Sequence, residues 1–469
     1  MSKLNKDITI LILEELQNDN KSLYSCLLVN RTWCEMTVPI LWKDPTKKYD
    51  PITGNACKIL FNVILLHLSD ESRNNLKNQE IDLFAKTHQR LLFNYINFWM
   101  HLDLCFLERA MHIYEMENSK ISILTDEILK LLINNDKKFK SLSIPGSFNS
   151  YLFSRVEHCF SDLQYFYCDC NININILKGL TIMSTSIEKL ELKIEYKSAT
   201  DPSRIIELIE AQKNLKEVNL TCKGTVINDD PYHKAIEESL IKCADTIQYL
   251  RINWEPITKF LSHLVNLVSL DLRYLFYNDI NWDYTISLPH LKFLYVKHIS
   301  SGVLANIIEN TNGYLSEIIL DYYHGDDGGR HIRAIYQHCS NLNYLKLSLQ
   351  NKDVLEFQNL LIICKLLSGL EVTGMDKFNW SELLKIMTKS PINLFKLKFI
   401  NPIFDFDDIR TLKLFLDNCK NRHPISLQII STKLWKWQIQ LQQLVHLLTE
   451  YKAKGIIKDF EYIERNLFC

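Results

Sequence analysis

The sequence predicts an α/β fold, in which a solenoid of short parallel strands and intervening helices follows an all-helical N-terminal region. Two observations predict it. From about residue 120 onward, the triplet apolar-x-x-apolar-x-apolar recurs at intervals of 20 to 32 residues. Before that point, apolar residues recur three or four positions apart, which is the spacing of one face of a helix.

Composition excludes several classes of protein. The chain has 469 residues, of which 47% are hydrophobic, so it is globular and large enough for an extended core. Lys and Arg number 54 against 55 for Asp and Glu, and this balance argues against a general nucleic-acid binder. No apolar run is long enough to span a bilayer, and the N-terminus runs straight into an amphipathic pattern, so we expect neither a membrane anchor nor a signal peptide. The 13 scattered cysteines favour a reduced protein of the cytoplasm or nucleus.

The N-terminal stretch Leu4–Trp42 is predicted to form three helices. Three helices in about 40 residues bury too little surface to be stable alone, so the apolar surface left over should be an interface. The apolar positions of the three segments are Ile8, Leu11, Ile12 and Leu16, then Leu23, Leu27 and Leu28, then Val29, Trp33, Met36 and Val38.

In its order of residues this stretch resembles an F-box. The matching residues are Leu4, Asp7, Ile8, Ile12, Leu13, Leu16, Leu23, Val29, Arg31, Trp33, Leu41 and Trp42. Asn5 departs from the pattern, because it replaces the usual proline, but an asparagine can still cap the first helix. The alternative is an N-terminal helical cap on whatever follows.

The resemblance covers residues 1–46, about a tenth of the chain. It implies docking on a Skp-type adaptor and, through the adaptor, on a cullin. The adaptor-binding residues that it implies are Leu4, Asp7, Ile8, Ile12, Leu13, Leu16, Leu23, Val29 and Trp33.

Residues 47–118 are predicted to be a helical spacer that caps the next domain. A joint at 43–51 carries two prolines and mixed charge, as linkers and turns do. After it, Ile59, Val63 and Leu66 recur at helical spacing, whereas the polar segment 69–79 is predicted to be a loop.

From residue 119 onward each repeated triplet predicts one buried strand, because alternate side chains of a strand face the same side. Looser copies lie at Pro424/Leu427/Ile429 and Ile457/Phe460/Tyr462. The eleven regular triplets are Phe139/Leu142/Ile144, Leu163/Phe166/Cys168, Ile187/Leu190/Leu192, Leu215/Val218/Leu220, Ile247/Leu250/Ile252, Leu267/Leu270/Leu272, Leu291/Leu294/Val296, Leu315/Ile318/Leu320, Leu342/Leu345/Leu347, Leu367/Leu370/Val372 and Leu394/Leu397/Phe399.

This period and pattern resemble leucine-rich repeats. The resemblance implies that residues 119–469 form a right-handed solenoid with a parallel sheet on its concave side and a helical cap at its C-terminal end. Amphipathic segments at 203–212 and 407–416 supply two of the helices. Four cysteines precede repeat starts and are similar to those of the cysteine-bearing subtype common in F-box proteins: Cys159, Cys243, Cys339 and Cys364. The ninth position departs from the family, since only Asn171 is of the usual type.

No motif for catalysis or a cofactor is present: there is no glycine-rich phosphate loop, no His-Glu-x-x-His and no paired Cys-x-x-Cys set. The segment His324–His331 packs two His and two Asp together, which leaves a metal site open, although its residues are ordinary turn formers. Cys168 and Cys170 lack the second pair that a zinc site needs. We therefore expect no cofactor and no metal.

Two further clusters have simple structural explanations. Asp405, Asp407 and Asp408 are predicted to cap a helix N-terminus. Trp435 and Trp437 precede a helical stripe and are predicted to be buried in a terminal cap rather than to form a binding site.

A substrate surface is predicted where outward positions of successive strands carry aromatic and arginine side chains, the residue types that dominate binding hot spots. The alternative is that the tyrosines only cover neighbouring strands in cross-strand pairs. The predicted substrate-binding residues are Tyr249, Arg251, Asp271, Arg273, Phe293, Tyr295 and Tyr344.

Together, the resemblances imply the substrate-recognition subunit of a Skp–cullin–F-box ubiquitin ligase. Such a subunit is not an enzyme: it holds an unknown protein substrate near the ubiquitin-loaded enzyme and gains effective concentration. The first alternative is a protein-binding scaffold without a role in degradation. A more distant one is a hydrolase, which would need a nucleophile–base pair that the sequence does not show.

Overall fold

In the computed structural model, the chain consists of two compact units, Met1–Gly224 and Thr225–Cys469. The structure describes residues 5–46, 54–81, 91–114, 116–133, 137–146, 148, 157–169, 174–195, 202–223, 231–273, 286–321, 329–375, 377–402, 404–431 and 438–464.

Three helices open the first unit, as predicted: α1 (Lys6–Glu15), α2 (Asn20–Cys26) and α3 (Arg31–Leu41). Each begins at a residue whose side chain accepts a hydrogen bond from a backbone N–H of the first turn, and these caps are Asn5, Asp19 and Asn30. The helices share a small core of Leu13, Leu23 and Cys26, against which Leu16, Trp33, Met36, Ile40 and Leu41 pack.

The helical spacer predicted for residues 47–118 differs from the structure in two places. The segment predicted to be a loop forms α5 (Asp70–Asn78), which Ser69 caps and a single buried residue, Leu76, anchors. The sheet also begins inside this range, because β1 (His101–Asp103) pairs with the next strand. Because α5 and β1 each have only one buried residue, neither shows the repeated spacing of apolar residues from which a helix or strand is predicted. The other elements here are α4 (Gly54–Leu66), η1 (Tyr95–Phe98), α6 (Leu104–His112) and α7 (Asn118–Leu132).

The strands of the first unit pair in parallel and in chain order, from β1 to β5. The elements that follow α7 are β2 (Ser141–Ile144), η3 (Glu157–Phe160), β3 (Tyr165–Cys168), α8 (Ile174–Met183), β4 (Lys189–Glu195), α9 (Pro202–Glu210) and β5 (Glu217–Lys223).

The second unit repeats this arrangement, and its strands from β6 to β14 are also parallel and in chain order. Its elements are α10 (Pro231–Ile241), β6 (Tyr249–Ile252), η4 (Phe260–His263), β7 (Ser269–Arg273), β8 (Phe293–Lys297), α11 (Ser301–Glu309), β9 (Glu317–Asp321), α12 (Arg330–His338), β10 (Tyr344–Leu349), η5 (Asn351–Asp353), α13 (Val354–Ile363), β11 (Gly369–Gly374), α14 (Trp380–Met387), β12 (Lys396–Ile400), α15 (Phe406–Asn418), β13 (Ile425–Ser431), α16 (Gln438–Ala453) and β14 (Ile457–Glu464).

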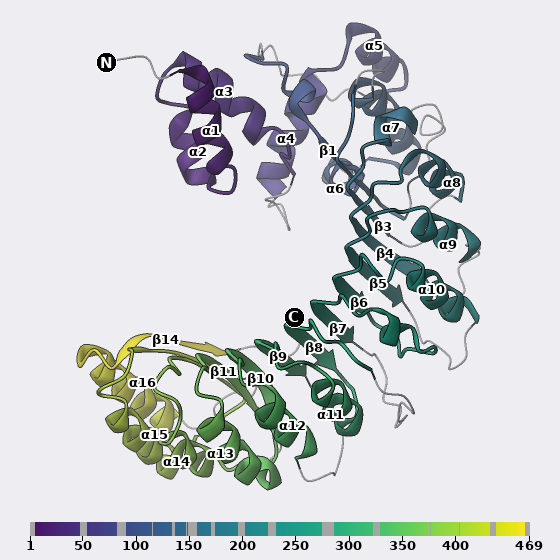
Figure 1. The fold of residues 1–469 in the computed structure, drawn as a ribbon. Helices are drawn as coiled ribbons and strands as arrows, with labels where there is room; N and C mark the ends of the chain where they lie inside the picture. Colours follow the sequence, from purple (N-terminus) through teal and green to yellow (C-terminus); the bar gives the residue numbers. More distant parts are fainter. Residues whose placement is uncertain are drawn as a thin grey trace. The chain divides into compact units, whose positions relative to one another are not determined.

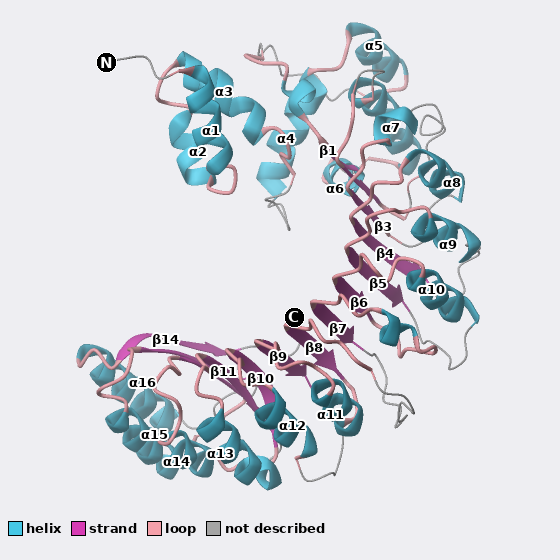
Figure 2. Cartoon of the chain, in the orientation of Figure 1, coloured by secondary structure: helices cyan, strands magenta, loops and turns pink. Residues whose placement is uncertain are grey.

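Within each unit the helices cover one face of the strands (Figure 1). Figure 2 shows this for α8 and α9 over β3 to β5, and for α11 to α15 over β8 to β13. We call the opposite side of the strands the open face. It is the face that the sequence predicts to be the concave, substrate-binding side.

The predicted register is confirmed, since no side chain of the eleven triplets is more than 4% exposed. Full burial of a side chain of this size contributes roughly 1.5–3 kcal/mol, so each triplet stabilises its unit. The helical stripe predicted near the C-terminal end forms α16, and the looser copy of the triplet at residues 457–462 forms a further strand, β14, so the predicted helix does not end the described chain. Phe460 and Tyr462 on β14 stay half-buried, because β14 has only one neighbouring strand, β13.

None of the helices in the described ranges is long and apolar enough to cross a membrane. The eleven cysteines of the described residues are free thiols, and nine of them are buried. Burial raises the pKa of Cys364 and Cys419 to about 11, so these thiols stay protonated at neutral pH and act as small apolar side chains.

Candidate protein-binding surfaces

The N-terminal helices expose a large apolar surface to solvent. Leu13 and Leu23 fill their core, and several neighbouring apolar side chains lie outside it. We call this surface the N-terminal apolar face; its residues are Ile8, Ile10, Leu11, Ile12, Tyr24, Leu28 and Val29, which are between 38% and 87% exposed. Ile8, Leu11 and Ile12 lie on one side of α1 by helical spacing, and exposed apolar surface of this kind marks interaction sites in monomeric proteins.

The predicted adaptor-binding residues divide between this face and the core beneath it. Leu13 and Leu23 are buried, while Leu16 and Trp33 are half-buried and pack against the core. Leu4 lies outside the described residues. On the solvent side are Asp7, Ile8, Ile12 and Val29. Tyr24 and Leu28 are exposed apolar residues that the predicted set did not include, although the helical spacing that marks Leu23 and Leu27 runs through Leu28.

On the open face of the second unit, Asp271 on β7 lies between two arginines. Its carboxylate is 2.7 Å from the Arg273 Nε atom and 3.6 Å from the Arg251 Nε atom. The arginines are exposed over 46% and 40% of their side chains, whereas Asp271 is only 14% exposed. One carboxylate therefore serves two guanidinium groups, which leaves this part of the face with an excess of positive charge.

Aromatic side chains flank this ion-pair cluster. Tyr249 on β6 and Phe293 on β8 occupy positions opposite Ser269 on β7. Tyr249 is exposed and Phe293 is half-buried. Next to them, the Tyr295 hydroxyl donates to Glu317 at 3.0 Å; burial and this hydrogen bond raise the pKa of Tyr295 to about 12.

Tyr344, the seventh predicted residue, belongs to a separate cluster that the sequence did not reveal. Its hydroxyl donates to the Glu371 Oε2 atom at 3.1 Å. Glu371 is only 4% exposed, although it lies on the open face. Its carboxylate forms ion pairs with the Nζ atoms of Lys346, at 3.2 Å, and Lys398, at 3.0 Å. The Lys346 ammonium also forms an ion pair with Asp321 at 2.6 Å. Burial alone would lower the pKa of Lys346, but the carboxylates of Asp321 and Glu371 have the larger effect and raise it. This network holds strands β9 to β12 together.

The open face of the first unit contains a hollow of about 750 Å³. It forms because β2 carries only Ser141 and Ser143 there, between the larger side chains of β1 and β3. His101 lies at this site, with its Nδ1 atom 2.8 Å from the Ser141 Oγ atom and 3.9 Å from Asp44. Both partners approach the same ring nitrogen, so the three residues cannot relay a proton as a serine–histidine–aspartate triad does.

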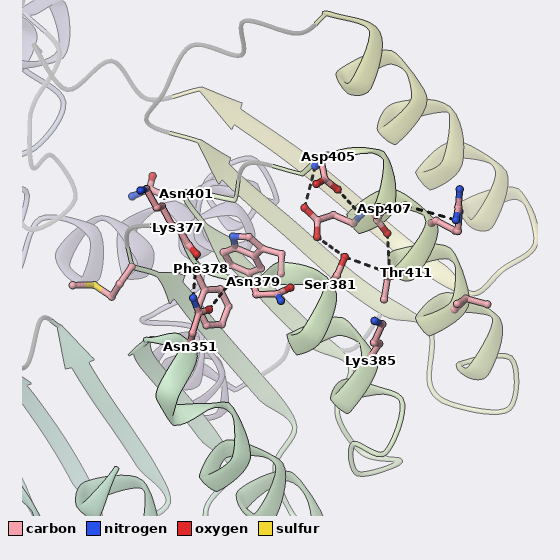
Figure 3. A pocket seen from close by; sticks show the side chains of 16 residues that line it. Asn351, Lys377, Phe378, Asn379, Ser381, Lys385, Asn401, Asp405, Asp407 and Thr411 are labelled. Carbon is pink, nitrogen blue, oxygen red and sulfur yellow. Dashed lines mark hydrogen bonds and ion pairs between the residues drawn. The ribbon is translucent and has the colours of Figure 1, made fainter. Parts of the chain in front are cut away.

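A second hollow, of about 980 Å³, lies where β11 and β12 lead into α14 and α15 (Figure 3). Ser381 donates to the Asp408 carboxylate at 2.7 Å. Asp405 and Asp408 form a reciprocal capping box at the start of α15, which confirms the predicted capping role of this acidic cluster. No histidine lines the hollow; Asp405 and Asp408 are engaged in the capping box, and the Asp407 carboxylate lies 3.6 Å from the Arg410 Nη1 atom.

The metal sites considered from the sequence lie partly outside the described residues. Within the described ranges, no group of three or more His, Cys, Asp or Glu side chains could hold a metal ion. His331 is buried, with its Nδ1 atom 2.7 Å from the Ser301 hydroxyl. Cys168 is buried in its triplet. His324, Cys170, Trp435 and Trp437 lie outside the described residues.

Sequence comparisons show no family for this chain. No protein-family model matches it, and neither does any curated protein sequence. Among solved structures, it is similar to the leucine-rich repeat-containing protein LegL7 from Legionella pneumophila, with 13% identity over 69% of this chain and 91% of that chain. The TM-score is 0.34, too low to carry an argument, so the case for repeats rests on the strand order and the buried triplets.

Proposed function

We propose that this protein is a substrate receptor of a Skp–cullin–F-box ubiquitin ligase. In this proposal the N-terminal apolar face docks on a Skp-type adaptor, and the open face of the strands binds a protein substrate. The chain itself supplies no catalytic group, because its task is to raise the effective concentration of the substrate near the ubiquitin-loaded enzyme.

The observation that carries the proposal is the division of apolar residues in α1, α2 and α3. Leu13, Leu23 and Cys26 form the shared core and Val38 is also buried, whereas seven large apolar side chains of α1, α2 and the turn before α3 lie on the surface. A unit this small gains little from so small a core. Each Leu or Ile that a partner buries adds roughly 1.5–3 kcal/mol, so an adaptor seated on this face would stabilise both proteins.

The open face supports the second half of the proposal. Arg251 and Arg273 present guanidinium groups to solvent next to the exposed ring of Tyr249. Arginine and tyrosine are enriched among residues that dominate binding energy. The two arginines are held by Asp271, so their side chains lose less conformational freedom when a partner binds.

The test is reconstitution of the complex from the full-length chain, a Skp-type adaptor and a cullin. We expect the three to co-elute from a sizing column. The paired substitution Ile8→Asp with Leu28→Asp should prevent co-elution, because it places unpaired charges in an apolar contact. The matched control is Ile439→Asp, at a residue that is 64% exposed on α16.

The two halves of the proposal fail in different ways. If the wild-type chain does not bind the adaptor, the ligase role is wrong. If it binds the adaptor but excludes the cullin, the chain is a scaffold that uses the adaptor without degradation.

A further inference from the structure

Strands β6, β7 and β8 carry more positive than negative charge at their outward positions on the open face. These positions hold three cations, Arg251, Arg273 and Lys297, and one carboxylate, Asp271. Lys297 lies opposite Arg273 on the neighbouring strand; it is exposed and has no ion pair within the described part of the chain. Three cations against one carboxylate leave two positive charges in excess on these strands.

The cations on the other described strands of the open faces are mostly neutralised by neighbours. In the first unit, β4 and β5 carry three lysines and three glutamates. In the second unit, Lys346 and Lys398 are both paired with the buried carboxylate of Glu371. Lys396 lies over the ring of Phe395. The unbalanced charge is therefore concentrated on β6, β7 and β8.

Aromatic rings lie next to these cations. The exposed ring of Tyr249 and the half-buried ring of Phe293 stand on the strands that flank Ser269, one outward position before Arg251 and Asp271 in the direction of the chain. A strand rises about 3.3 Å per residue, so successive outward positions are about 7 Å apart. A bound segment would therefore meet the rings and the cations with side chains that are close together in its own sequence.

We propose that this basic patch, formed by Tyr249, Arg251, Arg273, Phe293 and Lys297, binds an acidic segment of the protein substrate, in which Asp or Glu side chains adjoin an apolar one. The inference rests on the proposed function, since it names the kind of segment that the open face recognises.

The geometry at Asp271 leaves one guanidinium group available for such a segment. Asp271 accepts a hydrogen bond from the Arg273 Nε atom at 2.7 Å, whereas the Arg251 Nε atom is 3.6 Å away, beyond hydrogen-bond range. The Arg251 guanidinium therefore has donors left for a carboxylate of the substrate. Arginine suits this role, because its planar group can form two parallel hydrogen bonds with one carboxylate.

The experiment titrates the full-length chain into a fluorescein-labelled oligoglutamate peptide that contains one phenylalanine, and follows the fluorescence anisotropy. The matched probe has glutamine at every glutamate position. We expect the acidic probe to bind at least about tenfold more tightly than the glutamine probe, because only its carboxylates can pair with the three cations. The difference should shrink as salt is added, since salt screens exposed charges.

The paired substitution Arg251→Gln with Lys297→Gln should weaken binding of the acidic probe by about tenfold, because it removes two of the three cations and leaves Asp271 paired with Arg273. The matched control, Lys234→Gln with Lys389→Gln, removes two exposed lysines from α10 and from the turn after α14. It should leave binding unchanged.

Equal binding of the two peptides overturns the proposal. So does a variant with Arg251→Gln and Lys297→Gln that binds the acidic probe as the wild type does, or a single-stranded oligonucleotide that binds more tightly than the acidic peptide. Adaptor binding, measured on the same preparation, separates this test from the ligase role. A chain that binds the acidic probe but no adaptor keeps the basic patch and loses the ligase role, and a chain that binds the adaptor but neither peptide does the reverse.

Discussion

The ring of Tyr344 lies directly over Gly369, its partner on the neighbouring strand, and a Cβ atom added to Gly369 would be 2.5 Å from the Tyr344 Cδ2 atom. Glycine in a strand marks a place where another group approaches closely, and here that group is the tyrosine ring. The close approach places the Tyr344 hydroxyl on Glu371, the carboxylate at the centre of the lysine network.

We therefore predict that Gly369→Ala destabilises the second unit. The methyl group must push the ring of Tyr344 off the strand, which strains the side chain and lengthens its hydrogen bond to Glu371. We expect a loss of about 1–3 kcal/mol in the free energy of unfolding, measured by urea denaturation.

Gly54→Ala is the control for this prediction. No atom lies within 4 Å of a Cβ added there, and Gly54 is the first residue of α4, where alanine favours the helix. Equal stability of Gly369→Ala and the wild type would mean that the ring of Tyr344 moves aside freely.

Tyr344 and Gly369 illustrate what could and could not be predicted from the sequence. The inward triplets were predictable, because each strand places every second side chain in the core of its unit, and that requirement recurs with each repeat. The outward clusters were not, since they depend on which residues become neighbours across strands. In the sequence, Glu371 has the position of an ordinary exposed strand residue. Only the structure places Lys346 and Lys398 on the two neighbouring strands, on either side of it.

In the N-terminal helices, too, some features could be predicted from the sequence and others could not. Helical spacing predicted all three helices, and capping residues fixed where they begin. The same spacing could not separate core from surface, because Ile12 and Leu13 are adjacent apolar residues of α1 and only Leu13 is buried. Helix α5 and strand β1 were missed because each has a single buried residue, Leu76 and Leu102, and one residue has no period.

Because Leu13 is buried and Ile8 is exposed, substitutions at these two positions should separate an effect on folding from an effect on binding. Leu13→Ala should destabilise the N-terminal helices by about 2–5 kcal/mol, because it opens a cavity in a core of three residues. Ile8→Asp, at a residue that is half exposed, should leave thermal unfolding unchanged and abolish binding of a Skp-type adaptor. Differential scanning calorimetry and a pull-down with purified adaptor measure the two effects. Adaptor binding that survives Ile8→Asp would contradict the proposed docking face.

On the open face, the paired substitution Arg251→Ala with Tyr295→Ala should remove substrate binding while adaptor binding persists. Arg251 is one of two cations on Asp271, so its loss leaves that carboxylate paired with Arg273. The fold should lose no more than about 1 kcal/mol for the exposed ion pair, and about 1 kcal/mol more for the hydrogen bond from Tyr295 to Glu317. Proximity labelling in cells, with the wild type and the double variant compared, measures the loss of partners.

Tyr295→Phe refines this prediction. It keeps the ring and removes only the hydroxyl that donates to Glu317. Because the ring is kept, partners should remain bound, while stability falls by about 1 kcal/mol through the lost hydrogen bond to Glu317. Loss of partners would contradict binding through the ring. Partners that persist with the double variant, and disappear only when residues on the helix side of the sheet change, would show that the substrate binds elsewhere.

The last prediction concerns Lys137, whose ammonium donates to the backbone carbonyl of Ile96. Burial lowers the pKa of Lys137 from its ordinary value of 10.5 to about 8. Between these two values the unfolded chain binds more protons at this position than the folded chain does. The free energy of unfolding therefore rises with pH across that window, by at most about 1.4 kcal/mol per pH unit, and the gain is lost as the pH falls through 8.

Lys137→Met removes this titration, so the stability of the wild type should increase relative to the variant as the pH is raised from about 8 to 10. Urea denaturation at a series of pH values measures the difference. The control is Lys138→Met at the neighbouring, exposed position. If the curves of the wild type and Lys137→Met stay parallel over this range, the ammonium of Lys137 is hydrated in the folded protein, and the contact with Ile96 does not hold it out of water.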